Sequence, residues 1–482
     1  MKRNRKSKIL STLGPATSDK KIIKELFISG ADIFRLNFSH GSIEEHRKNY
    51  DHIRLLEKKY DHTTCILADL QGPKLRIGQF DNKEKKIKKG QQFSLDLDSS
   101  PGNDKRVNFP HKEIYEILTP NSVILIDDGK LRLQIIKQEK DCLTTEALND
   151  GIISDNKGVN IPDIILPISS LTSKDESDLN KALEMGVDWI ALSFVQTHKD
   201  IEELRKLVGN KVSIMAKIEK PSAVKNVDKI IDASDGLMIA RGDLGVELPT
   251  EQVPVIQKDI INRCREYGKP VVVATQMLES MISNNVPTRA EASDVANAIY
   301  DGTDAVMLSA ESAIGSYPVE SVTIMNKIIQ SVENDKNNFK LEDFHQNNSA
   351  KLKTSSTIDA ITSAAYTIAK NAGAKAIVTF SVSGKTTMRM AKERAPVLII
   401  GLSPNIKTAR KVQITWGVYS IHSEQDARNA TEMVSIACIA IKNKKLANNG
   451  DSIVITAGVP FGNAGSTNLL RIAKIIDNED LT

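Results

Sequence analysis

Charged residues follow two neighbouring apolar segments of the chain. In the segment AKIEKP, Lys217 and Glu219 are two residues apart, so both side chains project to the same side of a strand. The next apolar segment ends in ARGDLG and brings Asp243 to the same end. Neighbouring strands lie about 4.8 Å apart, and two carboxylates with water and substrate oxygens are the usual magnesium ligands. The spacing predicts a magnesium site, although a buried ion pair of Lys217 with Glu219 is the alternative.

Further polar residues end two other apolar segments. In DIFRLNFSHG every second residue from Arg35 is polar, so these side chains share one face of a strand. The next apolar segment ends in ADLQGPKLR. Arginine suits planar contacts to phosphate oxygens. Two arginines, one lysine and the two metal-binding carboxylates at one mouth favour phosphoryl transfer. The residues of this group are Arg35, Asn37, Ser39, Asp69, Lys74 and Arg76.

Three other features could be functional, and two of them have a second interpretation. Thr275 in VVVATQML is either a functional hydroxyl or an ordinary β-branched strand residue. Gly242 allows backbone N–H groups to approach an anion closely. The segment SVSGKTT (381–387) resembles a nucleotide loop, but Thr379 replaces the first glycine of that motif. It is therefore either a phosphate nest at a helix N-terminus or a helix-capping loop.

Eight apolar segments must position these groups. Most are rich in Val, Ile and Leu, as strands buried on both faces are, and helix-length segments separate most of them. Eight strand-plus-helix units predict a (β/α)8 TIM barrel, whose active site lies at the C-terminal ends of its strands. The eight segments are 8–14, 32–39, 63–70, 188–195, 212–219, 236–243, 270–277 and 304–311.

The third barrel strand is followed by an insert and not by a helix. Short segments with turn signals predict an all-β domain there, with strands at 74–80, 91–97, 122–126, 131–137 and 142–148. An insert at this point leaves from the C-terminal face of the barrel, so it is a candidate lid. A polar linker at 334–356 precedes a smaller α/β domain. The predicted domains are the barrel (1–70 and 168–345), the inserted β-barrel lid (71–167) and the C-terminal α/β domain (346–482).

Composition excludes several classes of function. The 482 residues carry 65 basic and 61 acidic side chains, and only 4% are aromatic, which argues against nucleic acid as a partner. The basic N-terminus is interpreted as a solvated tail and not as a signal peptide. The longest apolar runs are too short for a membrane span. Four cysteines without a CxxC motif predict reduced thiols in a cytoplasmic protein.

Nine ordered motifs give the chain its resemblance to a known family. They are STLGPAT, FRLNFSHG, DLQGPK, NKGVNIP, IMAKIEKPSAV, IARGDLGVE, ATQMLESM, PTRAEASDVANAIYDG and the C-terminal SGKT. Over nearly its whole length the chain resembles pyruvate kinase. The resemblance implies transfer of the phosphoryl group of phosphoenolpyruvate to ADP, which yields pyruvate and ATP in the last step of glycolysis. It also implies a homotetramer activated by a phosphorylated small molecule.

The resemblance also implies roles for individual residues. Glu219 and Asp243 would hold Mg²⁺, or alternatively Mn²⁺, Lys217 would neutralise the phosphoryl group in flight, and a second Mg²⁺ would arrive with ADP. Closure of the insert would exclude water. The remaining implied contacts are Arg35 to the transferring phosphate, Arg76 and Lys157 to the nucleotide, Asn37 and His40 to substrate, Gly242 and Asp243 to phosphate and carboxylate, and Thr275 to the proton relay.

The chain departs from the family pattern at a monovalent-cation site. Many members bind K⁺ through residues that match Asn37, Ser39 and Asp69, with Thr and Glu at the positions of Leu70 and Lys74. The ammonium group of Lys74 can replace the charge of the cation, so we expect activity without K⁺.

The C-terminal domain resembles the effector domain of the family. Its implied effector-phosphate ligands are Ser381, Ser383, Lys385, Thr386 and Thr387, beside the loop 458–467. The Trp and Arg that some members use for a second phosphate have no clear match near 416–430. A monophosphate such as a sugar phosphate or AMP is therefore the expected activator.

Two other functions remain as alternatives. A barrel lyase or aldolase acting on a pyruvate enolate would share the metal and its carboxylates, but it would not need Arg76, Lys157 or a lid. A catalytically inactive sensor would use only the effector domain, and the intact set of charged residues at the barrel mouth argues against it.

Overall fold

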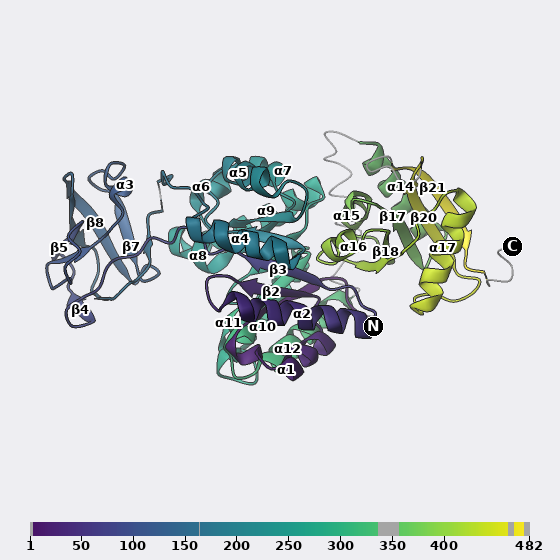
Figure 1. The fold of residues 1–482 in the computed structure, drawn as a ribbon, viewed down its shortest axis with the longest axis horizontal. Coiled ribbons are helices and arrows are strands. Elements are labelled where there is room, and N and C mark those ends of the chain that lie inside the picture. The colour runs from purple at the N-terminus through teal and green to yellow at the C-terminus, as the bar shows by residue number, and fades with distance from the viewer. Residues whose placement is uncertain (1–2, 163, 336–355, 461–466, 477–482) are drawn as a thin grey trace.

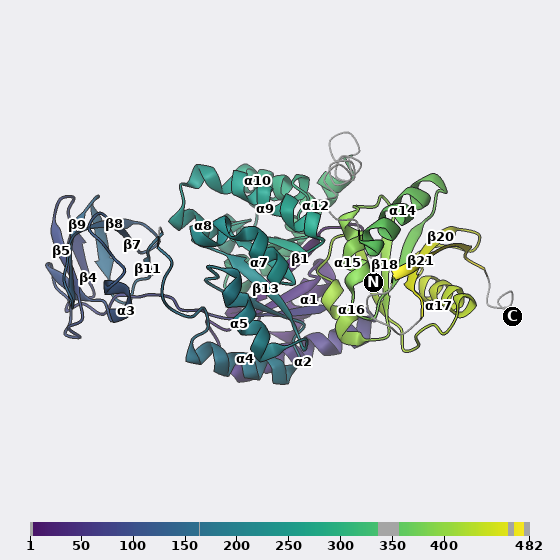
Figure 2. The ribbon, with the colours of Figure 1, turned by 90° about the horizontal axis from the view of Figure 1, so that it is seen from above.

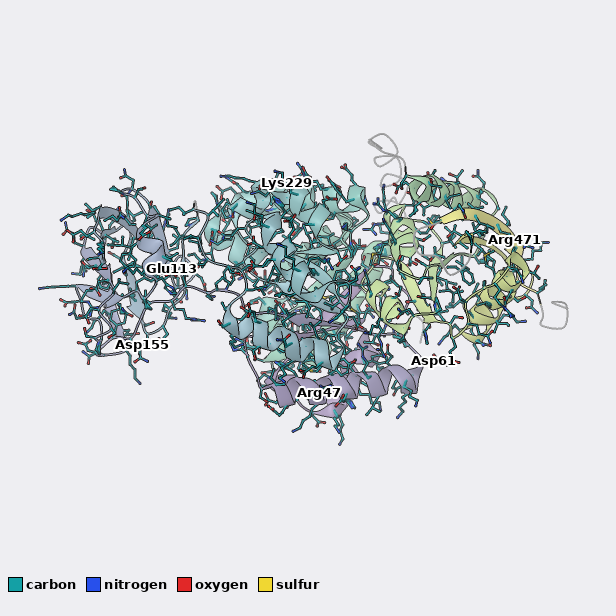
Figure 3. The ribbon with its side chains drawn as sticks, turned by 45° about the horizontal axis from the view of Figure 1, so that its top comes forward. Arg47, Asp61, Glu113, Asp155, Lys229 and Arg471 are labelled. Atoms are coloured by element: carbon teal, nitrogen blue, oxygen red, sulfur yellow. The ribbon has the colours of Figure 1, made fainter. Side chains whose placement is uncertain are left out.

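The barrel forms the middle of an elongated molecule, with the insert at one end and the C-terminal domain at the other (Figures 1 and 2). The computed structural model describes residues 3–162, 164–335, 356–460 and 467–476. Within these ranges no helix is long and apolar enough to cross a bilayer. Figure 3 shows charged side chains such as Arg47 and Lys229 on the outer helices.

Eight parallel strands close the barrel in the order β1-β16-β15-β14-β13-β12-β3-β2. Each lies within one of the eight apolar segments, so the predicted (β/α)8 barrel is confirmed. Nearly every residue of these strands is buried, because side chains fill the barrel on one side and the helices cover the other. The strands are β1 (Lys8–Leu13), β2 (Ile33–Asn37), β3 (Cys65–Asp69), β12 (Trp189–Leu192), β13 (Ser213–Ile218), β14 (Gly236–Ala240), β15 (Val271–Ala274) and β16 (Ala305–Leu308).

Hydroxyl side chains begin many of the helices that surround the barrel. Ser42, Thr172, Thr197 and Thr288 each form a capping box with an acidic residue three positions later, which satisfies free N–H groups of the first turn. The barrel helices are α1 (Lys20–Ser29), α2 (Ile43–Tyr60), α4 (Ser173–Met185), α5 (His198–Val208), α6 (Pro221–Lys225), α7 (Val227–Ala233), α8 (Arg241–Glu247), α9 (Val253–Tyr267), α10 (Arg289–Tyr300), α11 (Ala310–Ala313) and α12 (Pro318–Glu333).

The insert is an all-β domain, as predicted. A six-stranded sheet, in the order β11-β7-β8-β9-β5-β6, and the β10–β4 pair enclose one hydrophobic core. The predicted strand at 74–80 is wrong, because only single bridges at Arg76 and Phe80 form in that segment. The elements are β4 (Glu84–Ile87), β5 (Gln92–Asp96), β6 (Arg106–Asn108), α3 (Lys112–Tyr115), β7 (Val123–Ile126), β8 (Leu131–Gln138), β9 (Cys142–Ala147), β10 (Gly151–Ser154) and β11 (Val159–Asn160).

The C-terminal domain has the predicted α/β architecture. Its sheet runs β19-β18-β17-β20-β21, with β21 antiparallel to β20 and the other pairs parallel. Most of the linker predicted at 334–356 lies outside the described residues. The elements are α14 (Thr357–Asn371), β17 (Ala376–Phe380), α15 (Lys385–Lys392), β18 (Leu398–Ser403), α16 (Ile406–Val412), β19 (Val418–His422), α17 (Ala430–Asn443), β20 (Ser452–Gly458) and β21 (Thr467–Lys474).

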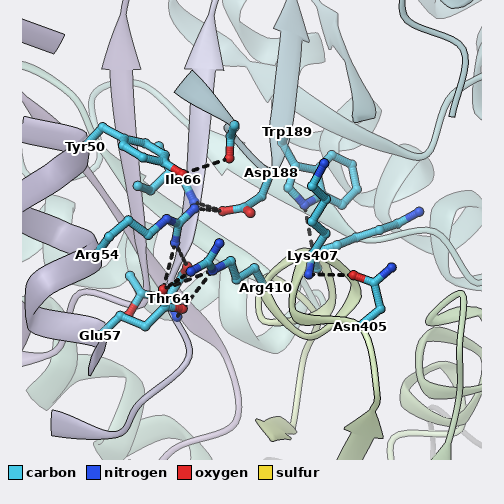
Figure 4. A network of polar contacts seen from close by, with 12 residues as sticks. Tyr50, Arg54, Glu57, Thr64, Ile66, Asp188, Trp189, Asn405, Lys407 and Arg410 are labelled. Carbon is cyan, nitrogen blue, oxygen red and sulfur yellow. Dashed lines mark hydrogen bonds and ion pairs between the residues drawn. The ribbon is translucent and has the colours of Figure 1, made fainter. Parts of the chain in front are cut away.

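The C-terminal domain closes the end of the barrel opposite the insert. One hydrophobic cluster runs from the barrel interior into this domain, and Trp189 of β12 donates its indole N–H to the carbonyl of Lys411 at 3.1 Å. Figure 4 shows the polar network beside it, in which Glu57 of α2 accepts from Arg410 of α16. This domain therefore covers the N-terminal end of the barrel, and the C-terminal mouth is the candidate site.

His62 is a buried, neutral group at this domain boundary. Its ring lies against Phe27 and Tyr419, with ring centroids 5.7 and 5.9 Å apart. Within the described structure its Nε2 has no hydrogen-bond partner. Burial, reinforced by the nearby positive charge of Arg3, lowers the pKa of His62 to about 3. Protonation of His62 therefore opposes folding.

We expect His62→Phe to weaken the dependence of stability on acid. The folded-state pKa lies below the unfolded value of 6.5, so the unfolded chain binds a proton first and stability falls as pH drops from 6.5 towards 3. This contributes up to about 1.4 kcal/mol per pH unit. Urea unfolding of both proteins between pH 4.5 and 7.5 checks it, and parallel stability curves would contradict the burial of a neutral imidazole.

Candidate active site at the barrel mouth

Lys217 is the centre of the charge cluster at the C-terminal mouth of the barrel. Its Nζ lies 2.9 Å from Oε1 of Glu219 and 3.3 Å from Oδ1 of Asp69, and it donates to Oγ of Ser193 at 2.7 Å. These four residues come from the ends of β3, β12 and β13. The structure thus brings Asp69 to Lys217 across an intervening strand, in addition to the predicted pair of Lys217 with Glu219.

Arg35 joins the same cluster from β2. Its Nε lies 2.6 Å from Oδ2 of Asp69, and its Nη1 donates to Oγ1 of Thr12 at 3.2 Å. The carboxylate of Asp69 therefore bridges an arginine and a lysine. Both cations lie at the mouth, where their charges attract an anionic ligand, although the three ammonium donors of Lys217 already face Ser193, Glu219 and Asp69.

The electrostatics of the cluster favour a charged Lys217 and disfavour an ionised Glu219. Burial opposes charge on Lys217, but Asp69 and Glu219 outweigh it and raise the pKa of Lys217 above its usual range. Burial raises the pKa of Glu219, Lys217 lowers it and Asp243 raises it again, with a net increase. Burial also acts on Asp69, yet Lys217 and Arg35 hold its pKa below the ordinary value. A bound cation would relieve the repulsion between Glu219 and Asp243.

Asp243 lies in the first turn of α8, directly after β14. β14 pairs with β13, so the carboxylates of Asp243 and Glu219 come from adjacent units of the barrel. Within the described residues, no group of three or more His, Cys, Asp or Glu side chains could hold a metal. Two oxygen ligands with open positions for water and substrate fit Mg²⁺ or Mn²⁺ and do not fit a closed structural site.

Thr275 follows the end of β15 in a left-handed conformation, with φ of +69°. Its hydroxyl donates to the carbonyl of Ala274 at 2.6 Å and accepts the N–H of Gly242, also at 2.6 Å. A β-branched residue rarely adopts this conformation, and such strain concentrates at functional sites. The interpretation of Thr275 as an ordinary strand residue is therefore wrong.

Several predicted ligands lie outside the charge cluster. Arg76 donates to the carbonyl of Asn156 at 2.8 Å, and Lys157 lies 2.9 Å from Asp127, all within the insert. Among the described contacts, no hydrogen bond or ion pair joins Lys74 to Asp69. Asn37 accepts the N–H of Ser39 at 3.2 Å, and His40 is exposed at the rim.

The predicted effector residues form the turn before α15. Ser383 and Lys385 are exposed on either side of Gly384, which has φ of +82°. Ser381 and Thr386 are buried, and the hydroxyl of Thr386 lies 2.5 Å from that of Thr467. Thr387 turns into the core, where its hydroxyl lies 2.8 Å from that of Thr379. Residues 461–466 of the neighbouring loop lie outside the described residues.

Three contacts in the cluster were not predicted from the sequence. Ser193 accepts from Lys217, Thr12 accepts from Arg35, and the backbone N–H of Phe194 donates to Oε2 of Glu219 at 2.7 Å. Ser193 lies near the C-terminal end of the apolar segment 188–195, which is the only signal that could have identified it. A backbone N–H has no residue type, so the Phe194 contact has no sequence signal.

This closed parallel barrel, with a lysine and acidic residues at its C-terminal mouth, defines an enzyme of the (β/α)8 class. The model of the pyruvate kinase barrel domain matches residues 4–322, and that of the pyruvate kinase alpha/beta domain matches residues 359–473. The chain belongs to the pyruvate kinase family and is an enzyme with pyruvate kinase activity. This finding replaces the alternatives of a barrel lyase and an inactive sensor.

Individual relatives match the chain from end to end. A pyruvate kinase of Agrobacterium vitis is 45% identical over 100% of this chain and 99% of its own length. One of Methylorubrum extorquens is 46% identical over 98% of both chains. The crystal structure of a pyruvate kinase from Cryptosporidium parvum superposes with a TM-score of 0.93 at 33% identity, covering 98% of this chain and 97% of that one.

Proposed function

We propose that the Lys217 cluster carries out the transfer between phosphoenolpyruvate and ADP. The observation that carries this proposal is the partly buried Lys217 ammonium, which lies between Glu219 and Asp69 beside Arg35. Lys217 and Arg35 would hold the phosphoryl oxygens and stabilise their charge during transfer. Preorganised cations in a site of low dielectric are the main source of catalysis in phosphoryl transfer.

Glu219 and Asp243 would hold the divalent ion, Mg²⁺ or Mn²⁺. When bound, the ion supplies charge stabilisation to phosphate and enolate oxygens. The Phe194 N–H and Lys217 Nζ orient the carboxylate of Glu219, so it needs little rearrangement to accept a ligand. This preorganisation supports the role of Glu219 as a metal ligand.

Thr275 would hold the proton that converts the enolate into pyruvate. The backbone N–H of Gly242 would hold the Thr275 hydroxyl in position. The N–H of Gly242 donates to the Thr275 hydroxyl, which orients that oxygen at the mouth. Arg76 and Lys157 in the insert would contact the nucleotide after closure. Asn37 and His40 would contact substrate at the rim.

A coupled assay with phosphoenolpyruvate and ADP tests this function directly. Turnover should require both substrates and a divalent ion, and ATP and pyruvate should form in equal amounts. Release of pyruvate without ADP, at the same rate, would contradict a phosphoryl transfer to nucleotide.

Regulation and assembly follow as finer proposals. The exposed Ser383 and Lys385 beside Gly384 support binding of a single phosphate group at the turn 381–387, from a sugar phosphate or AMP. The four free cysteines, three of them buried, support a reducing cytoplasmic location. A homotetramer is the assembly implied by the family.

Full activity without K⁺ is the outcome expected for this chain. Lys74 occupies the position where K⁺-dependent members have an acidic residue, and its ammonium can supply the missing charge after closure of the insert. The wild-type rate in tetramethylammonium buffer should lie within about twofold of that in 100 mM K⁺, since a fixed charge replaces a mobile one. Lys74→Met should lower the K⁺-free rate about tenfold, a loss of ~1.4 kcal/mol of transition-state stabilisation. A large loss of the wild-type rate without K⁺ would contradict the proposal.

A further inference from the structure

A buried ion pair joins the two elements that carry the proposed metal carboxylates. Lys220 follows Glu219 in the chain, and Glu247 is the last residue of α8, the helix that carries Asp243 in its first turn. Nζ of Lys220 lies 2.8 and 3.0 Å from the carboxylate oxygens of Glu247, and the two side chains are only 3% and 1% exposed. Burying two charges is costly, and the mechanism above uses neither of them.

The insert contacts this ion pair through its last strand. Asn160 of β11 donates Nδ2–H to Oε1 of Glu247 at 2.9 Å, and Nζ of Lys220 lies 3.4 Å from the carbonyl of Ile161. β11 directly follows Lys157 and Gly158, and Gly158 bridges to Arg76. The insert segment with both proposed nucleotide ligands is thus fastened at this point to the helix that bears Asp243.

We infer that Lys220, Glu247 and Asn160 form a hinge triad that sets the orientation of the insert relative to the metal carboxylates. These three are positioning residues, and the inference rests on the proposed role of the insert in nucleotide binding. The carboxylate of Glu247 accepts from both Lys220 and Asn160. A rotation of the insert that moves Asn160 away therefore breaks the hydrogen bond between Asn160 and Glu247. Lys220 fixes that acceptor and is covalently next to Glu219, and Glu247 lies on the same helix as Asp243, so the triad connects the insert to the elements that carry both proposed metal ligands.

Stability alone does not require these charges. An apolar pair of similar volume can replace a buried ion pair with little loss, or even a gain, of stability. An apolar pair cannot, however, accept a directional hydrogen bond from Asn160. The function that only the charged triad can supply is therefore the defined orientation of β11.

The variant Asn160→Leu distinguishes the orientation of the insert from the integrity of the metal site, because it removes only the hydrogen bond to Glu247. We expect the KM for ADP to rise about tenfold, whereas the KM for phosphoenolpyruvate and Mn²⁺ binding to the free enzyme stay within twofold. Spin labels at Lys89→Cys in the insert and Lys199→Cys on α5, in a Cys142→Ser background, should show a broader distance distribution. An unchanged KM for ADP or an unchanged distribution would overturn the inference.

The double variant Lys220→Met/Glu247→Leu distinguishes an effect on the orientation of the insert from an effect on the stability of the fold. Lys220→Met alone leaves a buried carboxylate unpaired, so it should lower the melting temperature, and the second substitution should restore it. The KM for ADP should nevertheless stay raised about tenfold in the double variant. Recovery of both quantities would reduce the triad to a structural ion pair.

Arg205→Met provides the matched control. Arg205 pairs with Asp235 at 2.6 Å just before β14, at the opposite end of the barrel. Its loss should lower the melting temperature and leave the KM for ADP unchanged, and an equal rise in that KM would overturn the inference. The distance distribution does not depend on catalysis. A failure of the proposed chemistry would instead appear as a wild-type enzyme without turnover of phosphoenolpyruvate and ADP.

Discussion

Replacement of Lys217 by methionine is expected to lower kcat about a thousandfold, a loss of ~4 kcal/mol of transition-state stabilisation. Methionine has a similar length but no charge, so the phosphoryl oxygens lose the cation that Glu219 and Asp69 hold in place. The KM for phosphoenolpyruvate should change much less, because Arg35 still binds the phosphate. A coupled assay under saturating substrates measures both constants.

Two controls accompany this variant. Lys217→Met leaves Glu219 without its counter-charge, so circular dichroism and melting temperature must show that the variant is folded. Lys181→Met removes an ammonium from an exposed ion pair on α4, where we expect an unchanged rate. A Lys217→Met enzyme that is folded and within tenfold of the wild-type rate would disprove the role of Lys217.

The barrel could be predicted because buried parallel strands are apolar along their whole length. Segments such as 63–70 and 304–311 therefore stand out from the helices between them. The insert was harder to predict. In KLRIGQF (74–80), apolar and polar residues alternate as in a strand, but the segment is a connection with single bridges. The charged strand β4 (EKKI) pairs only with β10, and such edge positions leave little hydrophobic pattern.

The site could be predicted only where its residues are close in sequence or follow a strand. Spacing placed Lys217 with Glu219, and the strand-end rule placed Asp69 and Arg35 at the same mouth. The contact of Asp69 with Lys217 depends on how far the closed barrel shears, because β12 lies between β3 and β13. The hinge triad joins residues from three elements, and no single segment contains its pattern.

Glu219→Gln should separate the two interpretations that the sequence left open for this residue, a metal ligand or only a partner of Lys217. The amide oxygen can accept from the Phe194 N–H or from the Lys217 ammonium but not from both, so one negative charge and one of these two contacts are lost, and circular dichroism must show that the variant is folded. If Glu219 is a metal ligand, half-saturation by Mn²⁺ should rise about a hundredfold, since affinity for such ions follows the number of charged ligands. Counting free Mn²⁺ by electron paramagnetic resonance measures this without turnover.

Asp228→Asn supplies the comparison for this charge change. Asp228 pairs with Arg263 on the exposed surface of α7 and α9, so its neutralisation should leave Mn²⁺ binding unchanged. Loss of rate in Glu219→Gln with unaltered Mn²⁺ binding would mean that Glu219 acts only through Lys217. Weaker binding of Mn²⁺ in Glu219→Gln, which keeps Lys217, would mean that Glu219 and Asp243 themselves bind the metal. The raised pKa of Glu219 favours the second outcome, because burial and the charge of Asp243 both disfavour an ionised Glu219 until a cation is bound.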